Sequence, residues 1–124
     1  RDFEGLAFVN LVDFDMLYGH RRDVAGYAAA ATEFDKFVAD FIPGMREGDI
    51  LMVTADHGCD PSYTKTTDHT REYVPYLIYG KGIKPGVDLG THLCFGTIAQ
   101  TICEYLGVDA SSLDGKSVWN EIKA

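Results

Sequence analysis

The stretch DILMVTADHG, residues 49–58, decides the fold, because it joins a short apolar segment directly to a carboxylate and an imidazole. Residues 49–55 are mostly apolar and follow a Pro-Gly pair, a pattern that predicts a buried strand. In open α/β sheets the functional site lies beyond the carboxyl ends of the strands, where the connecting loops converge. Asp56 and His57 therefore stand where such a site is expected.

Outward from this stretch, strand-like and helix-like segments alternate along the chain. Residues 6–12 (LAFVNLV) are a second apolar run. Phe34, Phe37 and Phe41 recur at the spacing of an amphipathic helix, which Asp23 can cap. The expected elements are strands over residues 6–12, 49–55 and 74–79, helices over 23–41 and 95–106, and a short helical piece over 117–122. This β-α-β-β-α order predicts an α/β fold with a mostly parallel sheet and helices packed on it.

Composition excludes several classes of protein. With 46% apolar and 24% charged residues among 124, the chain is typical of one soluble globular unit with a core of its own. No apolar run approaches the ~20 residues of a membrane span, and the first residues lack the layout of a signal peptide, so we expect a cytoplasmic protein without a membrane partner. Lys and Arg number 11 against 19 Asp and Glu, a net charge of -8, which is the wrong sign for a nucleic-acid partner.

The cysteines give no sign of a disulfide framework or a thiolate zinc site. Cys59, Cys94 and Cys103 are odd in number and lack CxxC spacing. We expect them to be buried or idle thiols.

Aspartate and histidine occur together in three places. The first strand runs into Asp15 and His20, the second runs into Asp56 and His57, and the pair Asp68 and His69 lies in the long polar loop over residues 56–72. Carboxylate oxygen and neutral imidazole nitrogen are suitable ligands for manganese, zinc or iron. For any single pair the alternative is a helix cap or a surface hydrogen bond, so the prediction of a divalent metal site depends on the three pairs together.

Three segments carry a resemblance to a known family. Residues 10–23 (NLVDFDMLYGHRRD), 54–58 (TADHG) and 67–75 (TDHTREYVP) resemble the closing part of the phosphopentomutase family, in the alkaline-phosphatase superfamily. TADHG is shared across that superfamily, including cofactor-independent phosphoglycerate mutases and sulfatase-like hydrolases, whereas DFDMLYGHRRD is narrower. The resemblance spans about residues 8–118. It implies a partial alkaline-phosphatase-like core, and an activity that interconverts ribose 1-phosphate and ribose 5-phosphate, with the deoxy sugars also accepted.

The resemblance also implies a set of site residues. It assigns Asp15, His20 and His69 to one manganese ion, and Asp56 with His57 to a second, both ions facing one phosphate. In two-metal sites the ions lie roughly 3.5 to 4 Å apart and stabilise the attacking and leaving oxygens.

Two arginines follow the first group of predicted ligands. Arg21 and Arg22 could place a guanidinium on a substrate phosphate. The alternative is a solvated helix start in which they pair with Asp23.

Parts of the family's machinery match nothing in this sequence. The threonine that is phosphorylated during the reaction, a further aspartate ligand and an inserted cap domain are missing. We therefore expect residues 1–124 to be the C-terminal portion of a metalloenzyme core domain, able to bind metal but inactive as a mutase alone. Cutting such a sheet exposes apolar strands, so we expect possible self-association through the exposed sheet surface.

The sequence leaves two other hypotheses about function open. One is a phosphatase or sulfatase-like hydrolase of the same superfamily, which shares the two-metal site and differs in the acceptor of the phosphoryl group. The other is a module without catalytic activity that binds metal or mediates association.

Overall fold

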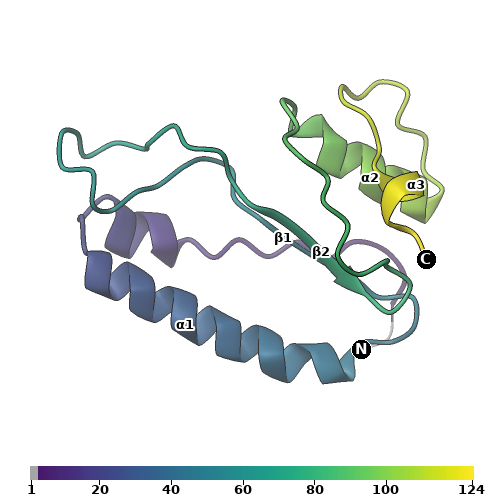
Figure 1. Ribbon diagram of the computed structural model, residues 1–124, viewed down its shortest axis with the longest axis horizontal. Coiled ribbons are helices and arrows are strands. Elements are labelled where there is room, and N and C mark those ends of the chain that lie inside the picture. The colour runs from purple at the N-terminus through teal and green to yellow at the C-terminus, as the bar shows by residue number, and fades with distance from the viewer. Residues whose placement is uncertain (1–2) are drawn as a thin grey trace.

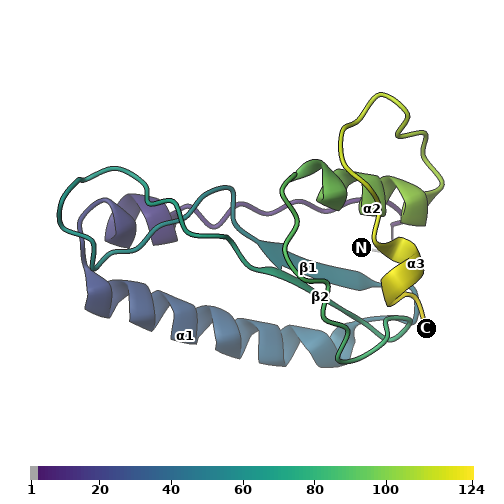
Figure 2. The ribbon, with the colours of Figure 1, turned by 45° about the horizontal axis from the view of Figure 1, so that its top comes forward.

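The computed structural model describes residues 3–124, arranged around a pair of strands. The hairpin strands lie between a long helix on one side and two shorter helices on the other (Figures 1 and 2). In chain order the elements are the π-helix η1 (Phe14–Gly19), α1 (Val24–Phe41), the 3-10 turn η2 (Ile42–Gly44), β1 (Ile50–Thr54), β2 (Tyr76–Gly80), α2 (Gly96–Leu106) and α3 (Trp119–Ile122). None of the described helices is long and apolar enough to cross a lipid bilayer.

The helices form where the sequence pattern predicts them. The Asp23 side chain accepts a hydrogen bond from Gly26 N at 2.8 Å and so caps α1, as expected. α2 ends at Gly107, which adopts the left-handed conformation with φ 67° that favours glycine. The short helical piece expected near the C-terminus is α3.

The prediction of a mostly parallel sheet is wrong for the described residues. β1 and β2 pair antiparallel, with Ile50 opposite Gly80 and Thr54 opposite Tyr76. Parallel neighbours need a crossover that carries the chain back along the strand, which is usually a helix. Residues 55–75 contain no helix and return directly, so the chain closes a long hairpin instead.

The strand predicted over residues 6–12 is not formed in the described part of the chain. This segment runs without hydrogen-bonded strand partners from η1 back along the molecule (Figures 1 and 2). Its side chains remain exposed, with Phe8 at 83% and Val9 at 75%. An apolar segment becomes a strand only where a neighbour can pair with its N–H and C=O groups, and no described strand does so here.

The buried core is smaller than a chain of this length can form. Val118, Ile122 and Thr101 are at most 2% exposed and lie where α2 meets the C-terminal segment. The chain exposes 9097 Å². A folded monomer of 13.7 kDa exposes about 6,600 Å² by the usual scaling with mass. Much apolar surface therefore stays exposed on the described residues.

Two segments far apart in the sequence meet at one end of the molecule. The loop between β1 and β2 reaches η1 there, at the left of both views (Figures 1 and 2). An isolated antiparallel bridge between Gly58 and Thr70 closes the base of the loop, with Thr70 N donating to Gly58 O at 3.1 Å. This meeting of loop and π-helix positions the candidate site.

Candidate metal centre

The candidate metal centre begins in η1, whose turn brings together two side chains five residues apart. In a π-helix each N–H bonds to the carbonyl five residues earlier, and His20 N donates to Asp15 O at 3.0 Å. Asp15 and His20 therefore lie on the same side of the turn, with His20 Nε2 3.3 Å from Asp15 Oδ2. An α-helical turn would have brought together positions three or four apart.

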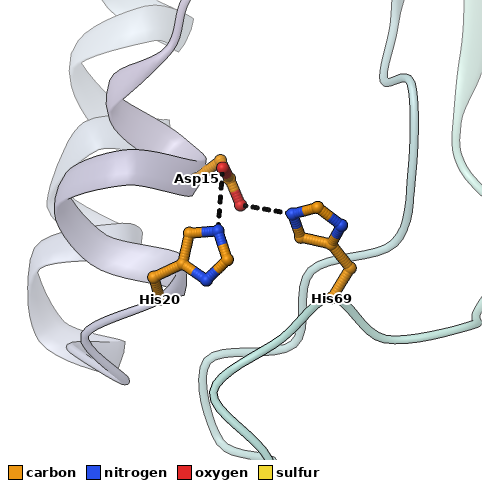
Figure 3. A group of neighbouring side chains, drawn as sticks. All are labelled: Asp15, His20 and His69. Atoms are coloured by element: carbon orange, nitrogen blue, oxygen red, sulfur yellow. Dashed lines mark ion pairs between the residues drawn. The ribbon is translucent and has the colours of Figure 1, made fainter.

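The third member of the group comes from the loop between β1 and β2. His69 Nε2 lies 3.4 Å from Asp15 Oδ1, so the two imidazoles face different oxygens of one carboxylate (Figure 3). One donor atom from each of Asp15, His20 and His69 lies within 4.8 Å of the others. All three side chains are partly exposed, so an ion from solvent can reach them.

A hydrogen bond on the far side of His20 determines which of its nitrogens faces the group. His20 Nδ1 lies 2.6 Å from Thr67 O. Because a carbonyl oxygen only accepts, Nδ1 carries a hydrogen, which leaves Nε2 as the ring nitrogen on the side of Asp15. Metal-binding histidines commonly donate their other N–H to a carbonyl or carboxylate in this way. The donor set therefore fits a divalent metal ion.

His69 has a carboxylate on its far side. Its Nδ1 lies 3.6 Å from Asp68 Oδ1, and its backbone N–H donates to the same oxygen at 2.8 Å. This backbone hydrogen bond is the main cause that lowers the pKa of Asp68. Asp68 is therefore kept ionised beside Nδ1 of His69, which leaves Nε2 on the side of Asp15.

Asp56 and His57, the predicted ligands of a second ion, lie beside this group and not within it. The His57 and His69 rings are stacked, with centroids 3.6 Å apart and an interplanar angle of 16°. His57 Nε2 lies 3.5 Å from Asp56 Oδ1, and the Asp56 side chain is 88% exposed. The structure thus places the second imidazole against the first group and leaves its neighbouring carboxylate facing solvent.

The two arginines predicted to bind phosphate differ in their surroundings. Arg21 is exposed to solvent. Arg22 turns back onto the loop, where its Nε and Nη2 atoms both donate to Thr66 O. Nη1 of the same side chain donates to Asp60 O at 3.1 Å, and Nη2 also donates to Asp68 O at 2.6 Å. The Arg22 guanidinium therefore donates its hydrogen bonds to backbone carbonyls of this chain. The alternative, in which Arg22 pairs with Asp23, is not observed among the described residues.

Cys59, expected from the sequence to be a buried or idle thiol, is half-buried and lies next to the group. Its Sγ atom is 3.9 Å from Asp15 Oδ1. Burial is the main cause that raises the pKa of Cys59, and the negative charge of Asp15 adds to it. The thiol therefore stays neutral beside the carboxylate. Its position directly after His57 and Gly58 was the available signal in the sequence.

Comparison with known proteins agrees with a metal-binding role. A sequence model of the metalloenzyme superfamily matches residues 1–110. The chain is 56% identical over 121 residues to a phosphopentomutase of Acetivibrio thermocellus, covering 98% of this chain and 31% of that protein. It is 54% identical over 121 residues to a phosphopentomutase of Lachnoclostridium phytofermentans (98% of this chain, 30% of that protein). It is 50% identical over 123 residues to one of Carboxydothermus hydrogenoformans (99% of this chain, 31% of that protein). The chain thus spans a little less than a third of the length of these relatives.

Proposed function

Because the chain belongs to the metalloenzyme superfamily, we propose that it forms the C-terminal part of the metal-binding core of a phosphopentomutase. The observation that carries this proposal is the convergence of Asp15, His20 and His69 from two distant segments. The relatives named phosphopentomutase, 50% to 56% identical over nearly the whole chain, support this activity over the other members of the superfamily.

The proposed ligands of the first ion are Asp15, His20 and His69, and manganese is the proposed metal. Mixed carboxylate and imidazole donors suit this ion, and the Asp15 side chain supplies the carboxylate donor. Bound ions would neutralise the charge of a phosphoryl group while it is transferred. Asp56 and His57 are proposed for a second ion, with further donors supplied by parts of the protein outside this chain.

The proposed reaction interconverts (deoxy)ribose 1-phosphate and (deoxy)ribose 5-phosphate, with a phosphothreonine as carrier. The threonine, a further aspartate ligand and a cap domain are assigned to the remaining length that the relatives have, since this chain covers about 31% of them. Arg21, which is exposed near the predicted ligands, is the proposed contact for a substrate phosphate. Residues 6–12 are proposed to join a larger alkaline-phosphatase-like sheet formed with strands from that remaining length.

Other expectations from the sequence stay proposals. We propose a cytoplasmic protein whose partner is a pentose phosphate, without nucleic acid or membrane as partners. The acidic net charge of -8 supports this, because phosphate binding then depends on the ions and not on the overall field of the protein.

Titration with Mn²⁺ tests the ion site directly. Asp15→Asn removes the carboxylate that both histidines face, so we expect the dissociation constant for Mn²⁺ to rise by at least about 100-fold. Loss of a residue that only hydrogen-bonds to a metal ligand already lowers metal affinity by about 10- to 100-fold. Asp13→Asn is the matched control, because it removes the same charge from an exposed residue just before η1 that makes no capping hydrogen bond. Equal affinities of the two variants and the wild-type protein would contradict the proposed site.

Substrate profiling of the full-length protein tests the activity. We expect turnover of pentose 1-phosphates and 5-phosphates into one another, abolished by Asp15→Asn. Release of inorganic phosphate from generic phosphate or sulfate esters without mutase turnover would assign the protein to the hydrolases instead. The 124-residue chain alone is expected to bind Mn²⁺ and to show no mutase turnover.

A further inference from the structure

Arg22 occupies a backbone position at which glycine is the usual residue. The turn after η1 is closed by two hydrogen bonds, Arg22 N to Gly19 O at 3.0 Å and Asp23 N to Tyr18 O at 2.9 Å. This pair of bonds defines a Schellman turn, whose left-handed residue is most often glycine. Arg22 adopts that conformation with φ 56°, the single positive φ among the described non-glycine residues. Arg22 thus carries a long side chain at a position where the backbone conformation favours glycine.

The Arg22 side chain is bound to a segment far away in the sequence. Its guanidinium donates to the carbonyls of Asp60, Thr66 and Asp68. His20 Nδ1 donates to the carbonyl of Thr67, which lies between Thr66 and Asp68 in the sequence, at 2.6 Å. The turn that carries His20 therefore holds three consecutive carbonyls of the loop, and the next residue is His69.

From this arrangement we propose that Arg22 is a positioning residue, which ties the loop to the turn after η1 and thereby holds His69 against Asp15. The inference rests on the ion site proposed above. Residues 55–75 contain no helix, and the Gly58–Thr70 bridge and the hydrogen bonds beside it order the loop only within itself, whereas Arg22 and His20 bond it to the turn after η1. Without the guanidinium the loop samples arrangements in which His69 is withdrawn, and the apparent affinity for the ion falls by the fraction of molecules that remain arranged for binding.

The same geometry argues against Arg22 as a phosphate ligand. A guanidinium has five N–H groups. Four hydrogen bonds from Nε, Nη1 and Nη2 go to loop carbonyls. One N–H, on Nη1, is left, so a phosphate bound through two N–H groups would displace at least one of the bonds that hold the loop carrying His69.

Arg22→Gly is the informative variant, because it removes the side chain and relaxes the backbone of the turn at once. In the full-length protein we expect it to raise the dissociation constant for Mn²⁺ at least tenfold, roughly, and to speed amide exchange of residues 58–70 in the metal-free protein by a similar factor. Arg22→Lys keeps the charge but loses the planar guanidinium, so its dissociation constant and exchange rate should lie between those of the wild-type protein and Arg22→Gly. Lys65→Ala is the control, since it removes a positive charge from an exposed position of the same loop.

Three readouts decide between the roles. If Arg22 is a positioning residue, Arg22→Gly keeps or raises the Tm of the metal-free protein, while the affinity for Mn²⁺ and the protection of the loop from amide exchange fall. If its role is merely structural, the Tm and the affinity for Mn²⁺ fall together. A phosphate ligand predicts unchanged Mn²⁺ affinity and loop exchange with a higher KM. Either of these last two results would overturn the inference. Failure of the wild-type protein to bind Mn²⁺ would instead overturn the proposed function, and the exchange measurement, made without metal, would still decide whether Arg22 orders the loop.

Discussion

Gly19 permits the close approach of Cys59 to the π-helix that carries Asp15. A Cβ atom on Gly19 would lie 2.2 Å from Cys59 Sγ and 3.0 Å from Phe14 O. Contacts this short force neighbouring atoms to move, which typically costs about 1–3 kcal/mol in a packed region. We expect Gly19→Ala to lower the free energy of unfolding by about this amount and to weaken Mn²⁺ binding, measured by denaturant titration and by Mn²⁺ titration.

Two further variants isolate the cause of this effect. Gly44→Ala is the control for the added methyl group, because nothing lies within 4 Å of its Cβ position. Adding Cys59→Ala to Gly19→Ala removes the closest clashing atom and should recover most of the loss. No recovery in the double variant would show that the crowding against Cys59 is not the reason.

At this scale the residue types of the site could be predicted, but their contacts could not. Pairing of aspartate with histidine identified Asp15, His20 and His69 as candidates, and the structure brings them together. The role of Arg22 depends on a positive φ and on carbonyls 38 to 46 positions away, which no local pattern encodes. Whether these groups hold manganese stays a prediction.

Thr101 joins α2 to the segment before α3 through its hydroxyl group. It is 0% exposed, donates to Thr97 O at 2.7 Å and accepts from Val118 N at 3.1 Å. Thr101→Val has nearly the same shape but leaves the buried Val118 N–H without a partner. We expect a loss of about 1–3 kcal/mol in the free energy of unfolding, measured by denaturant titration.

Thr101→Ser is the matched variant for this bond. It keeps the hydroxyl and removes one methyl group, so the expected loss is about 1 kcal/mol or less. A larger loss for serine than for valine would show that packing of the methyl group, and not the hydrogen bond, stabilises this contact.

Asp60 begins the loop that Arg22 holds, and its ionisation stabilises the first turn. Hydrogen bonds from the Ser62 hydroxyl and backbone N–H lower the pKa of Asp60. A lowered pKa in the folded state means that this stabilisation is complete above the unfolded value of about 3.9 and is lost as pH falls through the folded value. We expect NMR titration to give a midpoint below 3.9 for Asp60, with the Ser62 amide signal following it.

A second aspartate of the same kind provides an internal reference for this titration. Asp109 accepts equivalent hydrogen bonds from Ser111, which lower its pKa as well. Asp60→Asn should abolish the pH response of Ser62 below about pH 4 and leave that of Ser111 unchanged. A Ser62 signal that still titrates in the variant would contradict the assignment.

Elements were predicted better than their pairing. The spacing of Phe34, Phe37 and Phe41 and the cap at Asp23 are local signals, and α1 forms with those boundaries. The direction of β2 relative to β1 depends on the path of a loop without periodicity, so the sequence order alone suggested the wrong sheet. The π-helix was missed, because its one extra residue per turn leaves no repeat in so short a segment.

The whole molecule exposes more apolar side chain than a stable monomer of this size usually does. Phe8 is 83% exposed and Leu93 is 87% exposed. We expect the 124-residue chain in isolation to self-associate, with a mass above 13.7 kDa by light scattering during size-exclusion chromatography. Phe8→Asp should weaken this association by about tenfold, roughly 1.4 kcal/mol.

Thr64→Asp adds the same charge at an exposed polar position of the loop and is the control for this variant. A monomeric mass at every concentration, or equal effects of the two substitutions, would contradict an association surface that includes Phe8.

The five-residue interval between Asp15 and His20 suits a π-helical turn, in which residues five apart lie one above the other. At this interval an ordinary α-helix would set the two side chains about 140° apart around its axis, since each residue advances it by about 100°. Winding the segment as an α-helix without changing its length would therefore carry the imidazole away from the carboxylate. Substitutions between the two residues that favour ordinary α-helical winding should thus weaken the group even though Asp15 and His20 are kept.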